Sequence, residues 1–361
     1  MAALQPIFFE SKPDTNKAIQ RMEAWWEGEI LDRPPVQITA PRKDRRPLPT
    51  QNHATLRERW MDVDFNLDRA EAQIANTAWI GEILPNYHPN LGPDFMAALF
   101  GSPLEFAADT SWSAPILQDW SAIDGLNLQF DSRYFETLLA MTRAACQRAP
   151  GKFLVGHTDL HPAGDLCAAL RGPQQFCLDV IESPLEVEAL MRRIEPAFYL
   201  VYEAQHAILR AAGQSLTTTW LPAFAPGRYY VPSNDFSCMV SPQMFERFFA
   251  AEIEREVAWL DRSIYHLDGP QALPHLDRLL AMPRLDAIQF VYGAGAGPAS
   301  RWLDVYRKIQ AAGKSLHVYV DPEDLGAFIG GIAPPGVLIS THAESEEHAA
   351  ALLAQVEKWT A

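Results

Sequence analysis

Short apolar runs alternate with stretches of helical periodicity along most of the chain. Apolar, β-branched or aromatic runs that stop at Gly, Pro or polar residues indicate buried strands, whereas apolar residues three or four apart indicate helices. The pattern predicts strands at 36–39, 79–85, 152–157, 215–220, 263–268, 286–291, 315–320 and 336–340. It predicts helices at about 14–30, 54–78, 133–148, 173–212, 242–258 and 344–359.

This alternation of strands and helices predicts the fold class. Near-continuous apolar strands separated by helices are typical of a parallel sheet that is covered on both faces. Eight such strands in 361 residues predict a (β/α)8 TIM barrel, with a doubly wound sheet as the alternative. Because no linker, repeat or low-complexity tract interrupts the pattern, we expect residues 1–361 to form a single barrel domain with an N-terminal helical extension.

Composition narrows the class of protein. The net charge of −15 argues against nucleic acid or an anionic membrane as a partner. The four cysteines have no zinc-finger or CxxC spacing, and we recognise neither a signal peptide nor an apolar run long enough to span a membrane. We therefore expect a cytoplasmic protein that acts on a small molecule, and a homodimer is left open.

The stretch Ser263–Pro270, with the sequence SIYHLDGP, is the strongest candidate for chemistry. Side chains two apart on a strand share a face, so His266 and Asp268 point the same way at the end of the predicted fifth strand. An imidazole beside a carboxylate at a strand end suggests a metal site or an acid–base site. The alternative is a surface histidine that happens to precede a turn aspartate.

Polar residues also follow other predicted strands, at the barrel end where TIM-barrel active sites lie. In chain order they are Arg42, Arg45, Arg46, Glu82, His88, Asn90, His157, Asp159, His161, Arg228, Tyr229, Asp235, Gln289, Tyr292 and His342. His157, Asp159 and His161 offer a rival or additional ligand set. We favour the alternative for these three, a turn in which His161 only precedes Pro162.

The strand order and several short motifs resemble the uroporphyrinogen decarboxylase superfamily, which also contains zinc- and corrinoid-linked methyltransferases. Residues 42–49 look like the decarboxylase loop RxxxRxLP, and Arg42 and Arg46 match its two carboxylate-binding arginines. Glu82-Ile83-Leu84 is similar to the family's Asp-Ile-Leu, which places Glu82 at the catalytic aspartate.

Two further segments carry the resemblance. Asn234 and Asp235, upstream of Ser241-Pro242, resemble the family's Asp-Ser…Ser-Pro segment. His342 falls where the decarboxylases have Gly-His-Gly. The chain departs from the decarboxylases at Glu82, which is one methylene longer than aspartate, and it offers no counterpart of their active-site tyrosine near residues 165–172.

The HLDG sequence is similar to the HxCG motif of the methyltransferases, in which His and Cys bind zinc with a second Cys from the last strand. Here Asp268 replaces the first cysteine and His342 lies about where the second belongs. The resemblance therefore implies a metal set of His266, Asp268 and His342, suited to Zn²⁺ but also to Fe²⁺ or Mn²⁺. The alternative is that the metal site is lost and that these residues only form hydrogen bonds.

We expect metal-assisted methyl transfer from a small methylated donor to a corrinoid protein or another acceptor. An N/O-ligated cation is a stronger Lewis acid than a thiolate-rich zinc site, so oxygen or nitrogen substrates fit better than a thiol. The expected catalytic residues are Glu82, Asp235, Gln289 and Tyr292. The expected substrate-binding residues are Arg42, Arg46, His88, His157, Asp159, Arg228 and Tyr229. The alternatives are decarboxylation of a carboxylated tetrapyrrole or related acid, without a metal, and a non-catalytic barrel that binds a ligand or a corrinoid.

Overall fold

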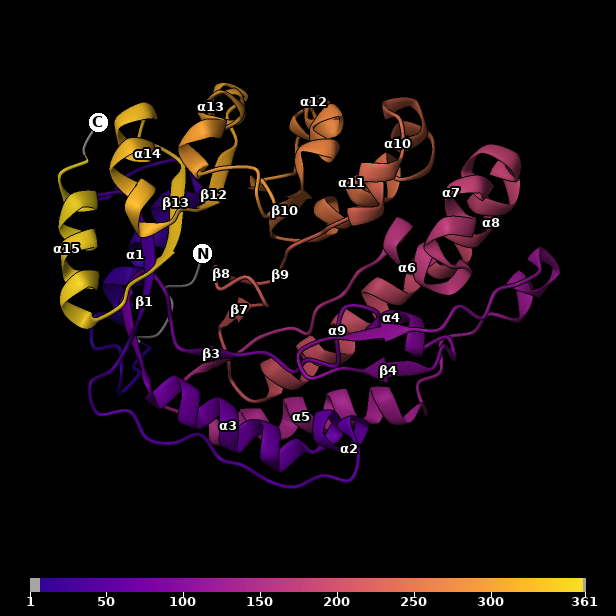
Figure 1. Cartoon of the computed structure of the whole chain (residues 1–361), viewed down its shortest axis with the longest axis horizontal. Helices are drawn as coiled ribbons and strands as arrows, with labels where there is room; N and C mark the ends of the chain where they lie inside the picture. The colour runs from indigo at the N-terminus through magenta and orange to yellow at the C-terminus, as the bar shows by residue number, and fades with distance from the viewer. Residues whose placement is uncertain (1–6, 360–361) are drawn as a thin grey trace.

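The computed structural model describes residues 7–359, in which helices surround a mainly parallel sheet (Figure 1). The strands are β1 (Val36–Pro41), β2 (Thr77–Gly81), β3 (Asn86–Tyr87), β4 (Leu104–Phe106), β5 (Ser111–Ser113), β6 (Leu154–Val155), β7 (Leu216–Thr218), β8 (Phe224–Pro226), β9 (Tyr229–Tyr230), β10 (Arg262–Asp268), β11 (Ala287–Val291), β12 (Ser315–Tyr319) and β13 (Val337–His342).

The α-helices are α1 (Thr15–Trp26), α2 (Leu56–Met61), α3 (Val63–Ala75), α4 (Phe95–Ala98), α5 (Arg133–Arg148), α6 (Ala163–Arg171), α7 (Pro173–Glu182), α8 (Pro184–Ile194), α9 (Pro196–Ala211), α10 (Pro242–Phe248), α11 (Ala250–Trp259), α12 (Leu276–Leu280), α13 (Leu303–Ala311), α14 (Leu325–Gly331) and α15 (Glu346–Glu357). Short 3₁₀ helices are η1 (Trp120–Gly125), η2 (Asp235–Met239), η3 (Pro270–His275), η4 (Ala299–Trp302) and η5 (Pro322–Asp324). None of the helices within residues 7–359 is long and apolar enough to cross a membrane.

A seven-stranded sheet in the order β2-β1-β13-β12-β11-β10-β9 forms the centre of the molecule. Every neighbouring pair in it is parallel except β1 and β2. The remaining strands form two-stranded sheets, β3 with β6, β4 with β5 and β7 with β8. Backbone hydrogen bonds also join the small sheets to one another. For example, the His157 amide donates to the Thr218 carbonyl and links the end of β6 to β7. The protein is thus an α/β protein whose parallel strands alternate with helices, as predicted.

The apolar segment 79–85 is not a parallel strand, contrary to expectation. Its first part is β2, which runs antiparallel to β1 at the edge of the sheet. The pairing ends at Gly81, whose φ is +72° and where a Cβ would lie 2.0 Å from the Val36 carbonyl oxygen. Glycine alone tolerates both conditions. The strand that pairs with β6 is instead the short β3, so Glu82 is displaced to the N-terminal end of β1.

The predicted helical stretch 173–212 consists of three helices, α7, α8 and α9. Each begins with a proline, at Pro173, Pro184 and Pro196. Proline fits the first turn of a helix, where its missing N–H is not needed, but it interrupts a helix interior. Apolar periodicity continued through these positions, which is why the sequence pattern predicted one helix.

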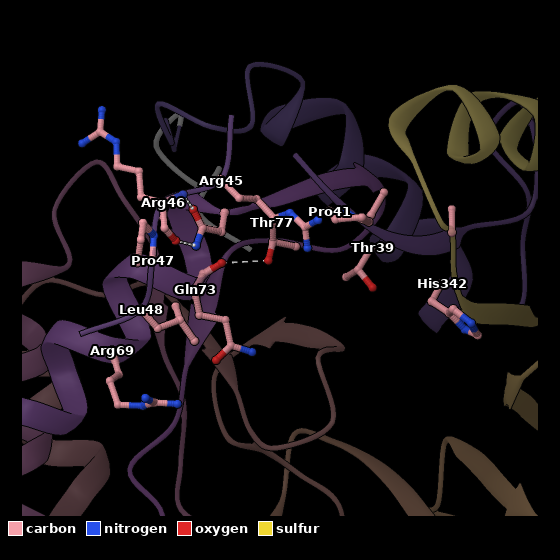
Figure 2. Close-up of a pocket in the computed structure, with 13 residues that line it drawn as sticks. Thr39, Pro41, Arg45, Arg46, Pro47, Leu48, Arg69, Gln73, Thr77 and His342 are labelled. Atoms are coloured by element: carbon pink, nitrogen blue, oxygen red, sulfur yellow. Dashed lines mark hydrogen bonds between the residues drawn. The ribbon is translucent and has the colours of Figure 1, made fainter. Parts of the chain in front are cut away.

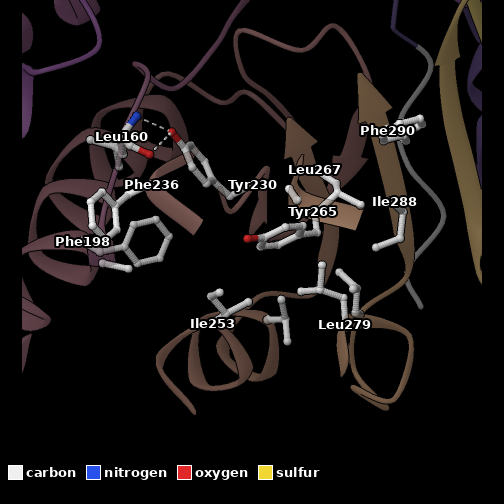
Figure 3. Packing of buried hydrophobic residues seen from close by; sticks show 14 of the residues in the cluster. Leu160, Phe198, Tyr230, Phe236, Ile253, Tyr265, Leu267, Leu279, Ile288 and Phe290 are labelled. Carbon is white, nitrogen blue, oxygen red and sulfur yellow. Dashed lines mark hydrogen bonds between the residues drawn. The ribbon is translucent and has the colours of Figure 1, made fainter. Parts of the chain in front are cut away.

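Helix α1 packs under the N-terminal ends of the strands. Its Trp25 indole donates to the Gly336 carbonyl, just before β13, and Trp26 donates to the Phe224 carbonyl in β8. On the other side of β10, Tyr265 packs with Ile253 of α11 and Leu279 of α12 in the main apolar core (Figure 3). The N-terminal ends of the strands are covered by α1 and their outer faces pack in the core. A functional site is therefore expected at their C-terminal ends.

Candidate functional site

His266 and Asp268 lie at the C-terminal end of β10, which stops at Gly269 and Pro270. Strand alternation places them on one face, while Tyr265 and Leu267 are buried in the core on the other. The Nδ1 atom of His266 lies 2.6 Å from Oε1 of Gln289 on the neighbouring β11. Because an amide oxygen only accepts hydrogen bonds, this contact places the proton on Nδ1 and leaves Nε2 of His266 free as a ligand.

Asp235 joins these two residues from the loop after β9. The chain before it runs beside β10, since the His266 amide donates to the Pro232 carbonyl. Oδ1 of Asp235 lies 3.9 Å from Nε2 of His266, and this oxygen is buried without a hydrogen-bond partner. One ligand atom each from Asp235, His266 and Asp268 lies within 4.8 Å of the others. A carboxylate, an imidazole and a second carboxylate at this spacing could hold a divalent cation.

A second group of three shares Asp235. Ligand atoms of His161, Asp165 and Asp235 also lie within 4.8 Å of one another. His161 comes from the loop after β6 and Asp165 from the first turn of α6. The Asp165 carboxylate accepts hydrogen bonds from the backbone amides of Asp235 and Phe236, at 2.9 and 2.7 Å, and so holds the start of η2 in place.

The pKa values of two groups in this cluster, Asp235 and His161, are both raised, but for different reasons. Burial, together with the neighbouring charge of Asp165, raises the pKa of Asp235 to about 6. Burial alone would lower the pKa of His161, but hydrogen bonds and charges from Asp159 and Asp165 raise it well above its ordinary value. The rings of Trp220 and His266 are perpendicular, with their centroids 5.3 Å apart, so Trp220 packs beside the imidazole.

A pocket of about 870 Å³ opens where β1 and β13 end (Figure 2). Three arginines line it, Arg45, Arg46 and Arg69, together with His342 from β13. Its wall continues into a second pocket of about 470 Å³ that reaches His88. Burial lowers the pKa of His88, and the charge of Asp159 acts in the opposite direction. A cationic pocket in so acidic a chain suits an anionic group of a ligand.

The structure brings together only part of the predicted metal set. His266 and Asp268 share a group with Asp235, which was expected to be catalytic. His342 is exposed, and its Nδ1 accepts a 2.6 Å hydrogen bond from the Tyr319 hydroxyl. Among the described residues, neither group that could hold a metal includes His342. The third residue of this group therefore comes from the segment after β9 and not from the last strand.

Glu82 has a structural role in this arrangement and lies away from the cluster. It is fully buried, and its carboxylate accepts two hydrogen bonds from Arg33, one from Arg21 and one from the Val36 amide. Val36 is the first residue of β1, so Glu82 sits at the N-terminal end of the strand. The expected catalytic position of Glu82 is corrected accordingly.

Three predicted substrate-binding residues are also placed elsewhere. His157 is fully buried, stacked on Tyr202 with ring centroids 3.9 Å apart. Tyr229 is fully buried and packs edge-on against Trp26. Arg228 precedes β9 at the N-terminal ends of β9 and β10, where it pairs with Glu203 at 2.8 Å. These three side chains pack the core or the opposite end of the strands.

Of the remaining predicted residues, some line the pockets, one contacts His161, and two belong to neither area. Arg46 and His88 line the pockets at the ends of β1 and β3, whereas Arg42 donates to the Thr77 carbonyl of β2 and is absent from the pocket lining. Asp159 accepts a 3.0 Å hydrogen bond from His161. Tyr292 follows β11, and burial together with the charges of Asp321 and Asp324 raises its pKa. It belongs to neither His/Asp group.

Asp165 is the residue that the sequence analysis missed. It follows His161 by four positions, and that spacing at the start of a helix was the available signal. The sequence analysis favours a turn at His161, and that interpretation does not predict a pairing with Asp165. The meeting of this loop with Asp235, 70 positions later, depends on the fold.

Comparison with known proteins gives a fold and no family. No family model matches the chain, and a search of curated proteins finds no match. Among solved structures, the chain is similar to a methyltransferase from Methanosarcina mazei, with a TM-score of 0.63 and 11% sequence identity. The superposition covers 95% of this chain and 98% of the other. The two chains therefore share a fold over nearly their whole lengths.

Proposed function

We propose that this protein is a metal-dependent methyltransferase of the uroporphyrinogen decarboxylase superfamily, built on a (β/α)8 barrel. In this proposal Asp235, His266 and Asp268 hold a divalent cation, Zn²⁺, Fe²⁺ or Mn²⁺. A small methylated molecule is the donor, and a corrinoid protein or another nucleophile is the acceptor. The proposal is supported by the shared fold with a methyltransferase together with the His/Asp group at the strand ends.

One observation carries the proposal: the hydrogen bond from Nδ1 of His266 to Gln289 leaves Nε2 available to bind a cation. Gln289 accepts from Nδ1 at 2.6 Å, so Nε2 keeps its lone pair, and it lies 3.9 Å from the buried, unpartnered Oδ1 of Asp235. Metal-binding histidines commonly donate their other N–H to such a partner, which fixes the tautomer and the ring orientation. A buried carboxylate oxygen without a partner is costly unless something positive binds it. The residues present therefore fit a cation.

The ligand set of this site leaves room for a substrate. Three protein ligands do not fill the coordination sphere of a four- to six-coordinate cation. A cation with nitrogen and oxygen ligands supplies Lewis-acid chemistry, since it withdraws electrons from a bound oxygen or nitrogen. The proposed residues would hold the donor heteroatom at that position, and Trp220 would limit water on one side of His266.

In the proposed transfer, the bond between the methyl carbon and the donor heteroatom breaks and its electron pair stays on the heteroatom. The acceptor nucleophile supplies the pair for the new bond to the methyl carbon. The heteroatom then takes up a proton, so no oxidant or reductant is required. Oxygen and nitrogen donors fit this site better than thioethers, because all three protein ligands are nitrogen or oxygen.

The test uses Zn²⁺-loaded protein, free cob(I)alamin as the acceptor and a panel of methanol, methylated amines and methoxylated aromatics. Methyl transfer converts cob(I)alamin to methylcobalamin, which absorption spectroscopy follows. We expect conversion by the wild type and by His348→Ala, a control at a half-buried histidine on α15, and a loss of more than 100-fold in His266→Ala. Equal rates in wild type and His266→Ala, or no conversion of any donor, would refute the proposal.

Decarboxylation is a second candidate because of the arginine pocket. Arg45, Arg46 and Arg69 could hold carboxylates by charge-assisted hydrogen bonds, and His342 lies beside them. Three arginines are few for a porphyrinogen with many carboxylates, which ranks this candidate second. Release of CO₂ from uroporphyrinogen that survives removal of metal and His266→Ala, but not Arg46→Ala, would favour decarboxylation over methyl transfer. A protein that binds such ligands without turnover would be a non-catalytic barrel.

A further inference from the structure

We infer that the site holds two cations, with the Asp235 carboxylate bridging them. The proposed function requires only the cation at Asp235, His266 and Asp268. The second would lie on the other side of Asp235, between His161 and Asp165. The two groups of potential ligands share Asp235 and no other residue. A carboxylate has two oxygens, so a single aspartate can contribute to both positions.

His161, like His266, has an acceptor at one ring nitrogen, but its other ring nitrogen faces Asp165, so a cation would replace a proton there. Its Nε2 lies 3.0 Å from Oδ2 of Asp159, and its Nδ1 faces Asp165, with 3.6 Å between Nδ1 and the nearer carboxylate oxygen. A carboxylate that receives the N–H of one ring nitrogen leaves the other nitrogen as the ligand. Two imidazoles, each oriented by its own acceptor, therefore flank Asp235, one from strand β10 and one from the loop after β6.

Asp165 can bind a cation while it keeps its structural contacts. Each of its oxygens accepts one backbone hydrogen bond, from Asp235 or from Phe236. Each carboxylate oxygen has two lone pairs, so one remains free on either atom. These backbone contacts also fix the distance between Asp165 and the bridging residue, which a dinuclear site needs.

The charge of the cluster favours two cations over one. Asp159, Asp165, Asp235 and Asp268 meet here, and among the described residues none of these four carboxylates forms an ion pair with Lys or Arg. In an ion-free state only the two histidines face them. One divalent cation offsets half of four negative charges, and two offset all of them. Paired cations roughly 3.5–4 Å apart are a known way to hold a substrate and a leaving oxygen together.

The experiment measures metal stoichiometry and magnetic coupling in the full-length chain. Apoprotein is dialysed against Mn²⁺, and bound Mn²⁺ per chain is determined by elemental analysis. Exchange coupling between neighbouring Mn²⁺ ions is then detected by EPR. The variants are His161→Ala, His266→Ala and Asp235→Asn, with His342→Ala as the histidine control, and circular dichroism shows whether each variant is folded.

We expect two Mn²⁺ per chain and a coupled signal in the wild type and in His342→Ala. Each of His161→Ala and His266→Ala should retain one uncoupled ion, and Asp235→Asn should weaken both sites at least tenfold. One ion in the wild type that His161→Ala does not alter would overturn the second site and leave the proposed function standing. If the wild type binds one ion, and that binding is lost in His161→Ala as well as in His266→Ala, the histidines share a single site. That result would also overturn the second site. No bound ion in folded wild type would overturn both proposals.

Discussion

Nδ1 of His266 and Oε1 of Gln289 lie 2.6 Å apart across the neighbouring strands β10 and β11. The parallel register places these two residues opposite each other, so the contact follows directly from strand pairing. In the proposed metal site Gln289 would therefore be a positioning residue that acts through His266, although the sequence suggested a catalytic role for it. The contact also gives the first testable consequence.

Gln289→Leu should weaken metal binding without unfolding the protein. Leucine removes the acceptor for Nδ1, so the ring can rotate or change tautomer, and loss of such partners commonly costs about 10–100-fold in metal affinity. Competition of Zn²⁺ with a chromophoric chelator measures the affinity. Gln289→Glu keeps an acceptor at the same place and should stay within about threefold of the wild type. Equal affinities for wild type and Gln289→Leu would show that the contact does not orient His266.

Glu82→Gln should reduce stability and leave metal stoichiometry unchanged. Glu82 is the carboxylate partner of the buried Arg33 and of Arg21, and breaking a buried pair by removing one partner costs about 3–5 kcal/mol. Urea unfolding measures the loss. The double variant Glu82→Gln/Arg33→Met removes both charges and should recover part of it. A direct role of Glu82 in catalysis would instead abolish turnover in a variant of wild-type stability.

Stability should fall as pH rises from about 5 to about 8, because of two buried carboxyls on α11. Burial, with a contribution from Glu195, raises the pKa of Glu252 to about 8, and burial together with Glu252 raises that of Glu256 well above its usual range. All four of their oxygens lack hydrogen-bond partners. In the unfolded chain both carboxyls ionise near pH 4.5.

Between these pKa values the folded state binds more protons than the unfolded state, so raising the pH favours unfolding. The protonated carboxyls of Glu252 and Glu256 stabilise the folded state fully at pH values below their unfolded pKa. This stabilisation is lost as the pH rises through their folded pKa values. Urea unfolding at pH 5, 7 and 9 should show Glu252→Gln/Glu256→Gln gaining on the wild type, by at most about 1.4 kcal/mol per pH unit and carboxyl. A pH-independent difference between the two proteins would contradict the raised pKa values.

Arg46 and Arg42 should differ in their effect on anion binding. Arg46 lines the pocket with Arg45 and Arg69, whereas Arg42 does not line it and donates a hydrogen bond to the Thr77 carbonyl. With citrate as a polycarboxylate probe, Arg46→Ala should weaken binding about tenfold or more, as expected for a lost charge-assisted hydrogen bond. Arg42→Ala serves as the matched control and should change binding less than threefold. Calorimetric titration measures both, and equal losses would place Arg42 in the pocket.

The strongest sequence expectations were local ones. β10, with His266 and Asp268 on one face, follows from residue alternation and from the stop at Gly269-Pro270, and the structure has that strand at Arg262–Asp268. Helix α5 occurs at the predicted bounds, 133–148, and in the structure the Ser132 side chain caps its first turn. Segment 79–85 was predicted in the wrong role, since an apolar run does not show whether its partner is parallel or antiparallel.

The sequence by itself determined several elements, among them β10 and α5, and the pairing of His266 with Asp268 on one strand face, because alternation, periodicity and Gly-Pro stops act over a few residues. Tertiary structure alone decided which loops meet at the end of β10. It brought Asp235 and the His161–Asp165 segment to His266, and it left His342 beside the arginines, 74 positions after Asp268. It also turned Glu82 from a candidate catalyst into the partner of Arg33. Local patterns cannot fix such contacts, because the sheet register and the path of each loop depend on packing across the whole chain.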